Sequence, residues 1–258
     1  MTVTLHHEIR GDGPRVLFIS GTGADLRLKP NAFSSPLPES FTVLAYDQRG
    51  QGRSAVPPGP WTMADYADDA AALLDAVGWD DAAVVGVSFG GMVAQELAIR
   101  HPARVTRLVL AVTSSGGAGG SSYPLHELTD VTRPTLERLL EIGDRRRDAL
   151  WRKDNDAFLE QAFAFWAEQR RTQSPDQARG AALQLEARRG HDTFDRLDEI
   201  TCPCLVVAGE YDDLAPVANS ERLVAALPDA RLEVLPGGHE VLFETAERWA
   251  SVLEFLVR

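Results

Sequence analysis

The hydrophobic pattern of the chain alternates between short apolar runs and longer stretches in which apolar residues recur every three or four positions. The short runs predict β-strands at residues 2–9, 15–20, 41–46, 82–87, 105–112, 203–208 and 231–235. The periodic stretches predict helices at residues 62–77, 89–100, 217–227 and 240–257. This alternation is typical of a mostly parallel sheet with helices on both faces. The turn residues 11–14 further predict a hairpin between the first two strands.

The alternation stops in the middle of the chain, where helical patterns follow one another without a strand. Amphipathic helices are predicted at residues 133–153, 156–172 and 175–189. They follow a run of glycine and serine, Ser114 to Ser122, that we expect to be too flexible to join the sheet. We therefore predict a core domain of residues 1–114 and 196–258, and a helical cap of residues 115–195 entered through a glycine-serine hinge.

Composition narrows the classes of partner. With 26 basic and 38 acidic residues the formal net charge is −12, which argues against nucleic acid and anionic membranes as partners. No apolar run is long enough for a transmembrane helix, and the first residues do not resemble a secretory leader. The two cysteines, Cys202 and Cys204, are too close on one strand for a disulfide. We therefore expect a cytoplasmic protein with reduced thiols.

The most informative motif is Gly86-Val87-Ser88-Phe89-Gly90, which lies between a predicted strand and a predicted helix. G-x-S-x-G in a strand–turn–helix context is the pattern of a nucleophile elbow. A serine at so sharp a turn has a strained backbone, and Gly86 and Gly90 suit positions where a side chain would collide with its neighbours. A glycine-rich turn without chemistry is the alternative, so the interpretation depends on finding partners for Ser88.

A serine hydroxyl needs a base within hydrogen-bond reach, and the base needs an orienting carboxylate. Of the six histidines, only His239 follows a late core strand, and it therefore shares an edge of the sheet with Ser88. Asp212 and Asp213 both follow the strand at residues 203–208, and their positions alone favour neither. The order serine, aspartate, histidine along the chain is the order found in α/β hydrolases.

Charge that develops on a carbonyl oxygen requires preorganised hydrogen-bond donors. The backbone N–H of Phe89, at the start of a predicted helix, is one candidate. The second should come from the loop after an early strand, Gly21-Thr22-Gly23, and we choose the N–H of Thr22.

These motifs together resemble the α/β-hydrolase superfamily over nearly the whole chain. The resemblance rests on Tyr46–Ser54, Gly86–Gly91, Gly209–Asp212 and Gly237–His239. Within the superfamily, residues 57–95 resemble the 3-oxoadipate enol-lactonase group, and residues 188–197 resemble both that group and the polyketide methyl esterases. The resemblance implies an α/β-hydrolase fold with a helical cap, and its Gly-x-x-Asp spacing selects Asp212 as the acid.

Two departures from the family pattern concern the site. The usual His-Gly oxyanion loop is replaced by Ser20-Gly21-Thr22-Gly23, which retains the backbone donors and lacks the histidine. Phe89 occupies a position at which the lactonase-like relatives commonly carry methionine.

Asp47, Arg49 and Ser54 match a signature that is structural in relatives, so we expect them to hold a turn.

The predicted activity is hydrolysis of a small-molecule carboxylic ester or lactone through an acyl-enzyme, without cofactor or metal. Ser88 would attack the carbonyl carbon, His239 would act as base and then acid, and Asp212 would orient His239. A C–C bond hydrolase, a perhydrolase and a receptor-like binding protein with negligible turnover are the alternatives. We expect mostly apolar cap residues over the site. Because the candidate catalytic residues lie outside residues 115–195, removing the cap should change selectivity more than chemistry.

Overall fold

The computed structural model describes residues 3–257, so the predicted strand position at Thr2 lies outside the described residues. The strands are β1 (His7–Arg10), β2 (Arg15–Ile19), β3 (Thr42–Tyr46), β4 (Ala82–Val87), β5 (Val105–Ala111), β6 (Cys204–Gly209) and β7 (Ala230–Leu235). They form one sheet in the order β1-β3-β2-β4-β5-β6-β7. Every pairing is parallel except that of β1 with β3, so the predicted mostly parallel sheet is confirmed.

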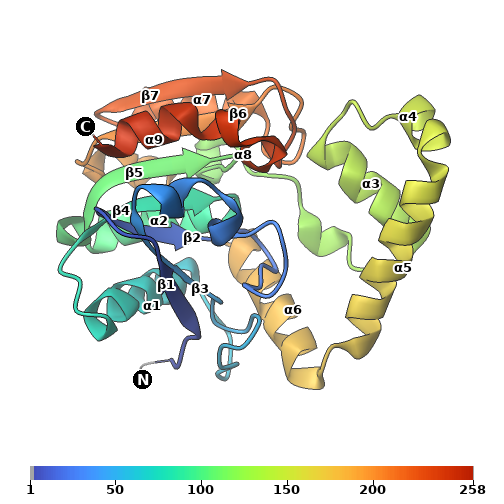
Figure 1. Ribbon diagram of the computed structural model, residues 1–258, viewed down its shortest axis with the longest axis horizontal. Coiled ribbons are helices and arrows are strands. Elements are labelled where there is room, and N and C mark those ends of the chain that lie inside the picture. Colours follow the sequence, from blue (N-terminus) through green and yellow to red (C-terminus); the bar gives the residue numbers. More distant parts are fainter. Residues whose placement is uncertain (1–2, 258) are drawn as a thin grey trace.

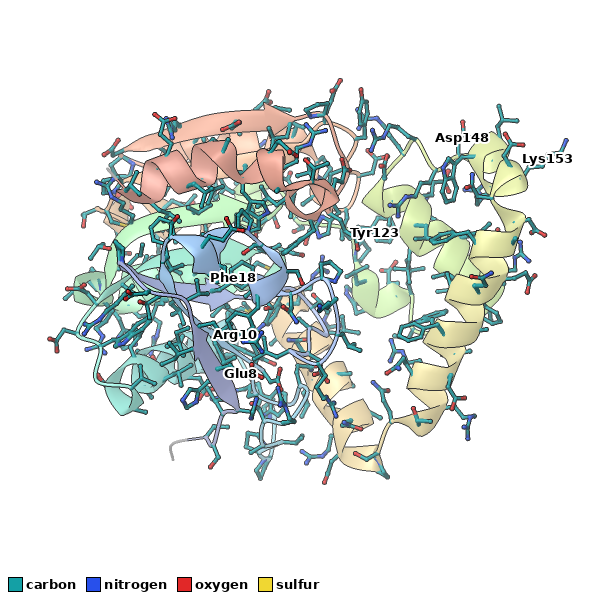
Figure 2. The ribbon with its side chains drawn as sticks, in the orientation of Figure 1. Glu8, Arg10, Phe18, Tyr123, Asp148 and Lys153 are labelled. Atoms are coloured by element: carbon teal, nitrogen blue, oxygen red, sulfur yellow. The ribbon has the colours of Figure 1, made fainter. Side chains whose placement is uncertain are left out.

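Helices cover both faces of this sheet (Figure 1). The helices next to the strands are α1 (Met63–Ala76), α2 (Phe89–Arg100), α7 (Val217–Ala226), α8 (Val241–Glu244) and α9 (Ala250–Val257). Residues alternate between the faces along each strand. Leu17 of β2 packs in a cluster with residues of α1, α2 and α7, whereas Phe18 packs with Trp249 and Val252 near the C-terminus. Figure 2 shows Phe18 in the interior of the core.

The predicted hairpin between the first two strands is wrong. β1 pairs with β3 in the antiparallel direction, with His7 opposite Tyr46, whereas β2 lies in the sheet interior between β3 and β4. The apolar residues of β2 are buried on both faces, and such a strand gains most from a central position. The polar β1 is largely exposed and suits the edge of the sheet.

Residues 115–195, the helical segment, contain no strand of the sheet and project beyond its end (Figure 1). The segment contains α3 (Arg133–Gly143), α4 (Ala149–Asp154), α5 (Asp156–Thr172) and α6 (Pro175–Arg189). Figure 2 shows Asp148 and Lys153 at the end of this segment that is remote from the sheet. Among residues 3–257, no helix has the length and apolar character that a membrane crossing requires.

Two predicted helices are interrupted. The stretch 133–153 breaks after Gly143, because Asp144 takes an extended conformation with φ −155° and ψ 105°. The stretch 240–257 breaks at Thr245, which is also extended, and a short 3₁₀ helix, η7 (Ala246–Trp249), precedes α9. Further 3₁₀ helices join the other elements: η1 (Ala32–Ser34), η2 (Leu37–Glu39), η3 (Pro102–Arg104), η4 (Gly117–Gly119), η5 (Leu125–Glu127) and η6 (Phe194–Glu199).

The glycine-serine run is packed into the protein where it begins, although it does lie outside the seven-stranded sheet. Ser114 and Ser115 are fully buried, and Gly116 forms an isolated bridge with Asp192 at the other end of the helical segment. A Cβ atom at Gly116 would lie 2.0 Å from the carbonyl oxygen of His191, so glycine is needed for this close approach. The two ends of the helical segment are therefore packed against each other.

His191 is buried in this junction, where its Nε2 lies 3.1 Å from the carbonyl oxygen of Ser114. Burial disfavours the charged imidazolium and lowers the pKa of His191 from 6.5 to about 4. In the unfolded chain the histidine regains its ordinary pKa. Between these two values the unfolded state binds more protons than the folded state, so stability is complete above pH 6.5 and falls as the pH decreases.

We predict that acidification from pH 7 to pH 5 lowers the free energy of unfolding by about 2 kcal/mol through His191 alone. Urea unfolding of the native protein and of His191→Gln at both pH values measures this contribution as the difference between their pH dependences. Replacement of the exposed His7 by glutamine is the matched control and should not reduce the pH dependence. Equal pH dependence in the native protein and His191→Gln would contradict the prediction.

Candidate active site

Ser88 stands at a sharp turn between β4 and α2. Its backbone has φ 56° and ψ −118°, a combination that is strained for any residue with a side chain. A Cβ atom at Gly86 would lie 2.5 Å from the carbonyl oxygen of Gly90, and one at Gly90 would lie 2.0 Å from that of Ile19. Both glycines are therefore required by close packing around the serine, and the strained turn predicted from the sequence is confirmed.

Three side chains from different loops form a hydrogen-bonded chain at the carboxyl edge of the sheet. His239, after β7, has its Nε2 2.9 Å from the Ser88 hydroxyl and its Nδ1 2.7 Å from Asp212, which follows β6. Asp212 accepts from Nδ1–H, so Nε2 is left as the acceptor for the serine hydroxyl. The arrangement is one in which an imidazole can remove the hydroxyl proton as the serine attacks a carbon atom.

The structure distinguishes the two neighbouring aspartates. The side chain of Asp212 is fully buried, and its Oδ1 accepts hydrogen bonds from the N–H groups of Leu214 and Ala215 at 2.8 and 2.9 Å. Its other oxygen is thereby aimed at His239. The side chain of Asp213 is half exposed and pairs with Arg145 at 3.3 Å. Of the two aspartates, it is Asp212 that contacts the histidine.

The loop expected to donate to a carbonyl oxygen lies against the serine. A Cβ atom at Gly21 would be 4.0 Å from the Ser88 hydroxyl oxygen. Among residues 3–257, neither the N–H of Thr22 nor that of Phe89 has a hydrogen-bond acceptor. The next N–H along the loop, that of Gly23, donates to the side chain of Gln184 on α6 at 2.8 Å. The helical segment therefore holds this loop directly.

Sequence reasoning missed three residues that support the elbow, one at the end of β5 and two directly after it. The Thr113 hydroxyl donates to the carbonyl oxygen of Ser88 at 2.7 Å. Val112, one residue earlier, has φ 46°, a strained value for a β-branched side chain. The N–H of Ser88 donates to the carbonyl of Ala111 at 2.9 Å. No local pattern marks residues 111–113, because their role depends on the pairing of β4 with β5.

The structural signature after β3 is confirmed. Asp47 accepts hydrogen bonds from the N–H groups of Leu26 and Arg53, at 2.7 and 2.9 Å. Arg49 forms a buried ion pair with Asp69 of α1, with its Nε 2.7 Å from the carboxylate. These contacts hold the loop after β3 against the loop after β2 and against α1.

The end of α3 contacts both loops that carry the acid and the histidine. We call residues 142–145 the α3 terminal turn. The carbonyl oxygens of Ile142 and Gly143 accept from the N–H groups of Asp213 and His239 at 2.9 and 2.6 Å, and the N–H of Arg145 donates to Tyr211 at 3.0 Å. These contacts change the expectation for cap removal, because residues 115–195 include part of the frame that holds Asp212 and His239.

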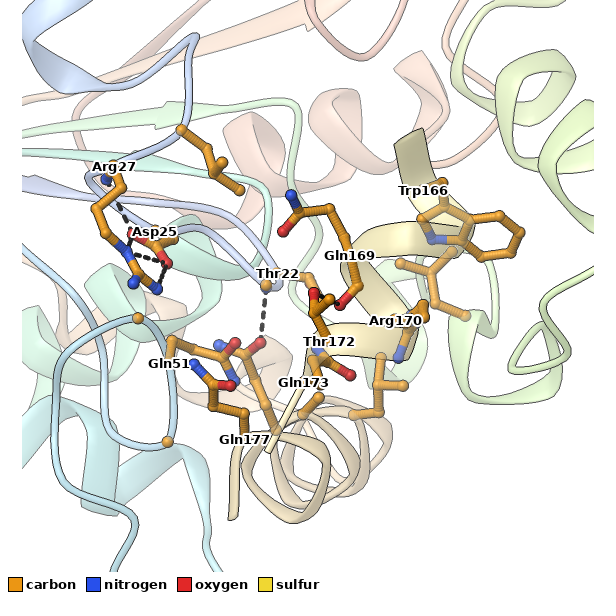
Figure 3. Close-up of a pocket in the computed structure, with 18 of the residues that line it drawn as sticks. Thr22, Asp25, Arg27, Gln51, Trp166, Gln169, Arg170, Thr172, Gln173 and Gln177 are labelled. Atoms are coloured by element: carbon orange, nitrogen blue, oxygen red, sulfur yellow. Dashed lines mark hydrogen bonds and ion pairs between the residues drawn. The ribbon is translucent and has the colours of Figure 1, made fainter. Parts of the chain in front are cut away.

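A cavity of about 780 Å³ lies between the core and the helical segment. On the core side, the cavity is lined by Thr22 and Gly23, which belong to the loop beside Ser88. Figure 3 shows Gln51 entering from a core loop and Gln169, Gln173 and Gln177 from the helical segment. The expected apolar side chains are present and include Phe165, Trp166 and several leucines. The glutamines are a polar feature that the sequence did not indicate.

Comparison with known proteins identifies the family. A profile described as "Alpha/beta hydrolase family" matches residues 16–252. The chain is 34% identical to "Putative carbamate hydrolase RutD" of Variovorax paradoxus over 98% of this chain and 96% of that protein. It is 26% identical to 3-oxoadipate enol-lactonase 2 of Acinetobacter baylyi over 96% and 90% of the two chains. The chain belongs to the α/β hydrolase family. This membership supports the prediction that the protein is a hydrolase.

The solved structures agree with this assignment. The enol-lactonase from Burkholderia xenovorans LB400 matches with a TM-score of 0.79 and 25% sequence identity, over 99% of this chain and 97% of that one. The α/β-hydrolase fold and the resemblance to the enol-lactonase group, both expected from the sequence motifs, are confirmed.

We predict that the two aspartates differ sharply in their effect on turnover. Asp212→Asn should lower kcat/KM for an ester by about three to four orders of magnitude, because an amide cannot hold His239 in the required tautomer. Asp213→Asn should cost less than about tenfold, since it loses only a half-exposed ion pair. Steady-state kinetics of both variants on one ester measures the difference. The reverse ranking would assign the orienting role to Asp213.

Proposed function

We propose that this protein hydrolyses carboxylic esters or lactones with Ser88 as the nucleophile. The observation that carries the proposal is the chain of hydrogen bonds from Asp212 through His239 to Ser88. The N–H groups of Thr22 and Phe89, which have no acceptor among residues 3–257, are suited to hold the oxyanion.

The reaction then proceeds in two halves. As the Ser88 oxygen bonds to the acyl carbon, His239 Nε2 takes the hydroxyl proton, and the carbonyl oxygen becomes an oxyanion bound by the two N–H groups. The intermediate collapses with cleavage of the bond to the leaving oxygen, which takes the proton from His239. Water, deprotonated by His239, attacks the acyl-serine, and Ser88 recovers its proton as the acid leaves.

The division into a core and a cap is part of this proposal. We assign residues 1–114 and 196–258 to an α/β core domain and residues 115–195 to a cap over the substrate cavity. The cavity between these parts and its apolar and polar lining support the assignment. The cap would also support the catalytic loops, because the α3 terminal turn forms backbone hydrogen bonds with the loops that carry Asp212 and His239.

The similar proteins support attack on an acyl carbon. Their printed names cover a lactone and a carbamate, and both substrates contain an acyl carbon bonded to a heteroatom. A C–C bond hydrolase, a perhydrolase and a binding protein without turnover use the same residues differently. Turnover of a short p-nitrophenyl ester separates the enzyme from the binding protein, because a binding protein gives a single slow burst and not many turnovers. A panel of esters and lactones then identifies the bond that is cleaved.

We predict that Ser88→Ala abolishes turnover of a short p-nitrophenyl ester, with a loss of about three orders of magnitude or more, and leaves the fold intact. Ser40→Ala is the matched control, because Ser40 is exposed and lies outside the proposed site. Retention of more than about a tenth of the activity in Ser88→Ala would assign the nucleophile elsewhere. A single slow burst in the native protein would favour a binding protein.

The contact between the α3 terminal turn and the histidine loop gives a further prediction. A Cβ atom at Gly238 would lie 2.4 Å from the carbonyl oxygen of Gly143, so Gly238→Ala must push the histidine loop away. We expect kcat to fall by about tenfold or more, since small misplacements of reacting groups are costly. Gly190→Ala, whose added atom meets only ordinary contacts at 3.7 Å, is the control. Equal activity in both variants would show that the contact does not position His239.

A further inference from the structure

The cavity is lined by buried polar side chains that the protein itself leaves unpaired. Gln184 and Gln51 have exposed fractions of 0% and 8%, and the Nε2 atoms of both have no hydrogen-bond partner among residues 3–257. The Oγ1 atom of Thr22 is buried and unpaired in the same way. All three residues line the cavity, and Thr22 follows Gly21, which lies against Ser88. A buried donor without an acceptor is destabilising, so a ligand that supplies an acceptor removes this penalty.

The orientation of the Gln184 amide is fixed by its neighbour. Its Oε1 accepts from the N–H of Gly23 at 2.8 Å, and only the oxygen end of an amide can accept. The NH₂ end is therefore the group left free. A single side chain thus holds the loop beside Ser88 with one end and offers two N–H donors with the other.

Gln51 supplies a similar group from the core side of the cavity. It lies in the loop after β3, whereas Gln184 lies on α6, and α6 meets this loop closely, since Gly180 approaches the backbone of Gly50. Figure 3 shows Gln51 among the residues that surround the cavity. The two amides come from parts of the chain that are distant in sequence, and both line the same cavity.

The charges around the cavity favour an uncharged ligand group at these amides. Three lining residues are charged, Asp25, Arg27 and Arg170. The Nε–H of Arg27 donates to both carboxylate oxygens of Asp25 at 3.0 Å, so these two charges offset each other. Arg170 is partly exposed and lies over the ring of Trp166 at 6.0 Å. A buried carboxylate requires a charged partner, whereas a neutral carbonyl oxygen is satisfied by amide donors.

We propose that the cavity selects acyl groups that carry a second, uncharged carbonyl oxygen, which Gln184 Nε2 and Gln51 Nε2 bind. This selectivity rests on the proposed ester or lactone hydrolysis at Ser88. An acyl chain of the same length without the second carbonyl leaves both amides unpaired and is disfavoured for that reason. Because Gln184 also holds Gly23, binding of the second carbonyl orders the loop that carries the Thr22 N–H.

Matched ester pairs test the proposal. Ethyl 4-oxopentanoate is compared with ethyl pentanoate, and ethyl 5-oxohexanoate with ethyl hexanoate, by kcat/KM for the native protein. We expect at least one oxo ester to exceed its partner by about tenfold. Ratios near one for both pairs would overturn the proposal.

Variants assign the selectivity to the two amides. Gln184→Glu keeps an acceptor for Gly23 and replaces the free donor with an oxygen, and Gln51→Met removes the donor without touching the Gly23 contact. Each should lower the ratio of oxo to plain ester by about tenfold. Gln161→Glu adds the same charge at an exposed position of α5 outside the cavity and should leave the ratio unchanged. Retention of the native ratio in both cavity variants would overturn the proposal.

Two further measurements separate this inference from the proposed function. Monoethyl glutarate carries a carboxylate at the position of the ketone in ethyl 5-oxohexanoate, and a preference for it that Arg170→Gln removes would show recognition of charge and overturn the proposal. If no ester is hydrolysed, the proposed function fails, and calorimetric titration of the protein with each ester pair still tests the cavity. Tighter binding of the oxo esters would then support the inference, and equal binding would refute it.

Discussion

The strained turn at Ser88 is the constraint on which the rest of the structure depends. A serine with φ 56° is tolerated only where its surroundings hold it, and here they do so from three sides. The carbonyl of Ile19 leaves room for no side chain at Gly90, β4 and α2 fix the two arms of the turn, and the Thr113 hydroxyl binds the serine carbonyl. The result is a hydroxyl that stands clear of the sheet at the beginning of a helix.

Parallel strands bring the partners of that hydroxyl to the same edge. The loops after β4, β6 and β7 carry Ser88, Asp212 and His239, and β5 separates the first of these strands from the other two. The distance between neighbouring strands is fixed by their hydrogen bonds, so the loops meet only if the sheet is complete. The α3 terminal turn adds a second frame, because it bonds the latter two loops from outside the sheet.

The helical segment therefore contacts the candidate site more directly than its position between the two parts of the core sequence implies. Its two ends are joined at a buried junction that includes Ser114 and His191, and Gln184 reaches from α6 to the loop beside the serine. The same side chain faces the cavity with its free amide group. In the proposed function, substrate recognition and the position of the loop that carries the Thr22 N–H would therefore share one residue.

Local physical rules made much of this protein readable from its sequence. The alternation of strands and helices, the strained elbow at Ser88, and the placement of His239 and Asp212 after late strands depend on short segments. The choice of strand partner for β1, the breaks at Asp144 and Thr245, and the burial of Ser114 depend on contacts between distant segments. Gln184 binds a residue 161 positions away, and only the assembled structure brings such a pair together, because no local pattern records which surfaces will meet.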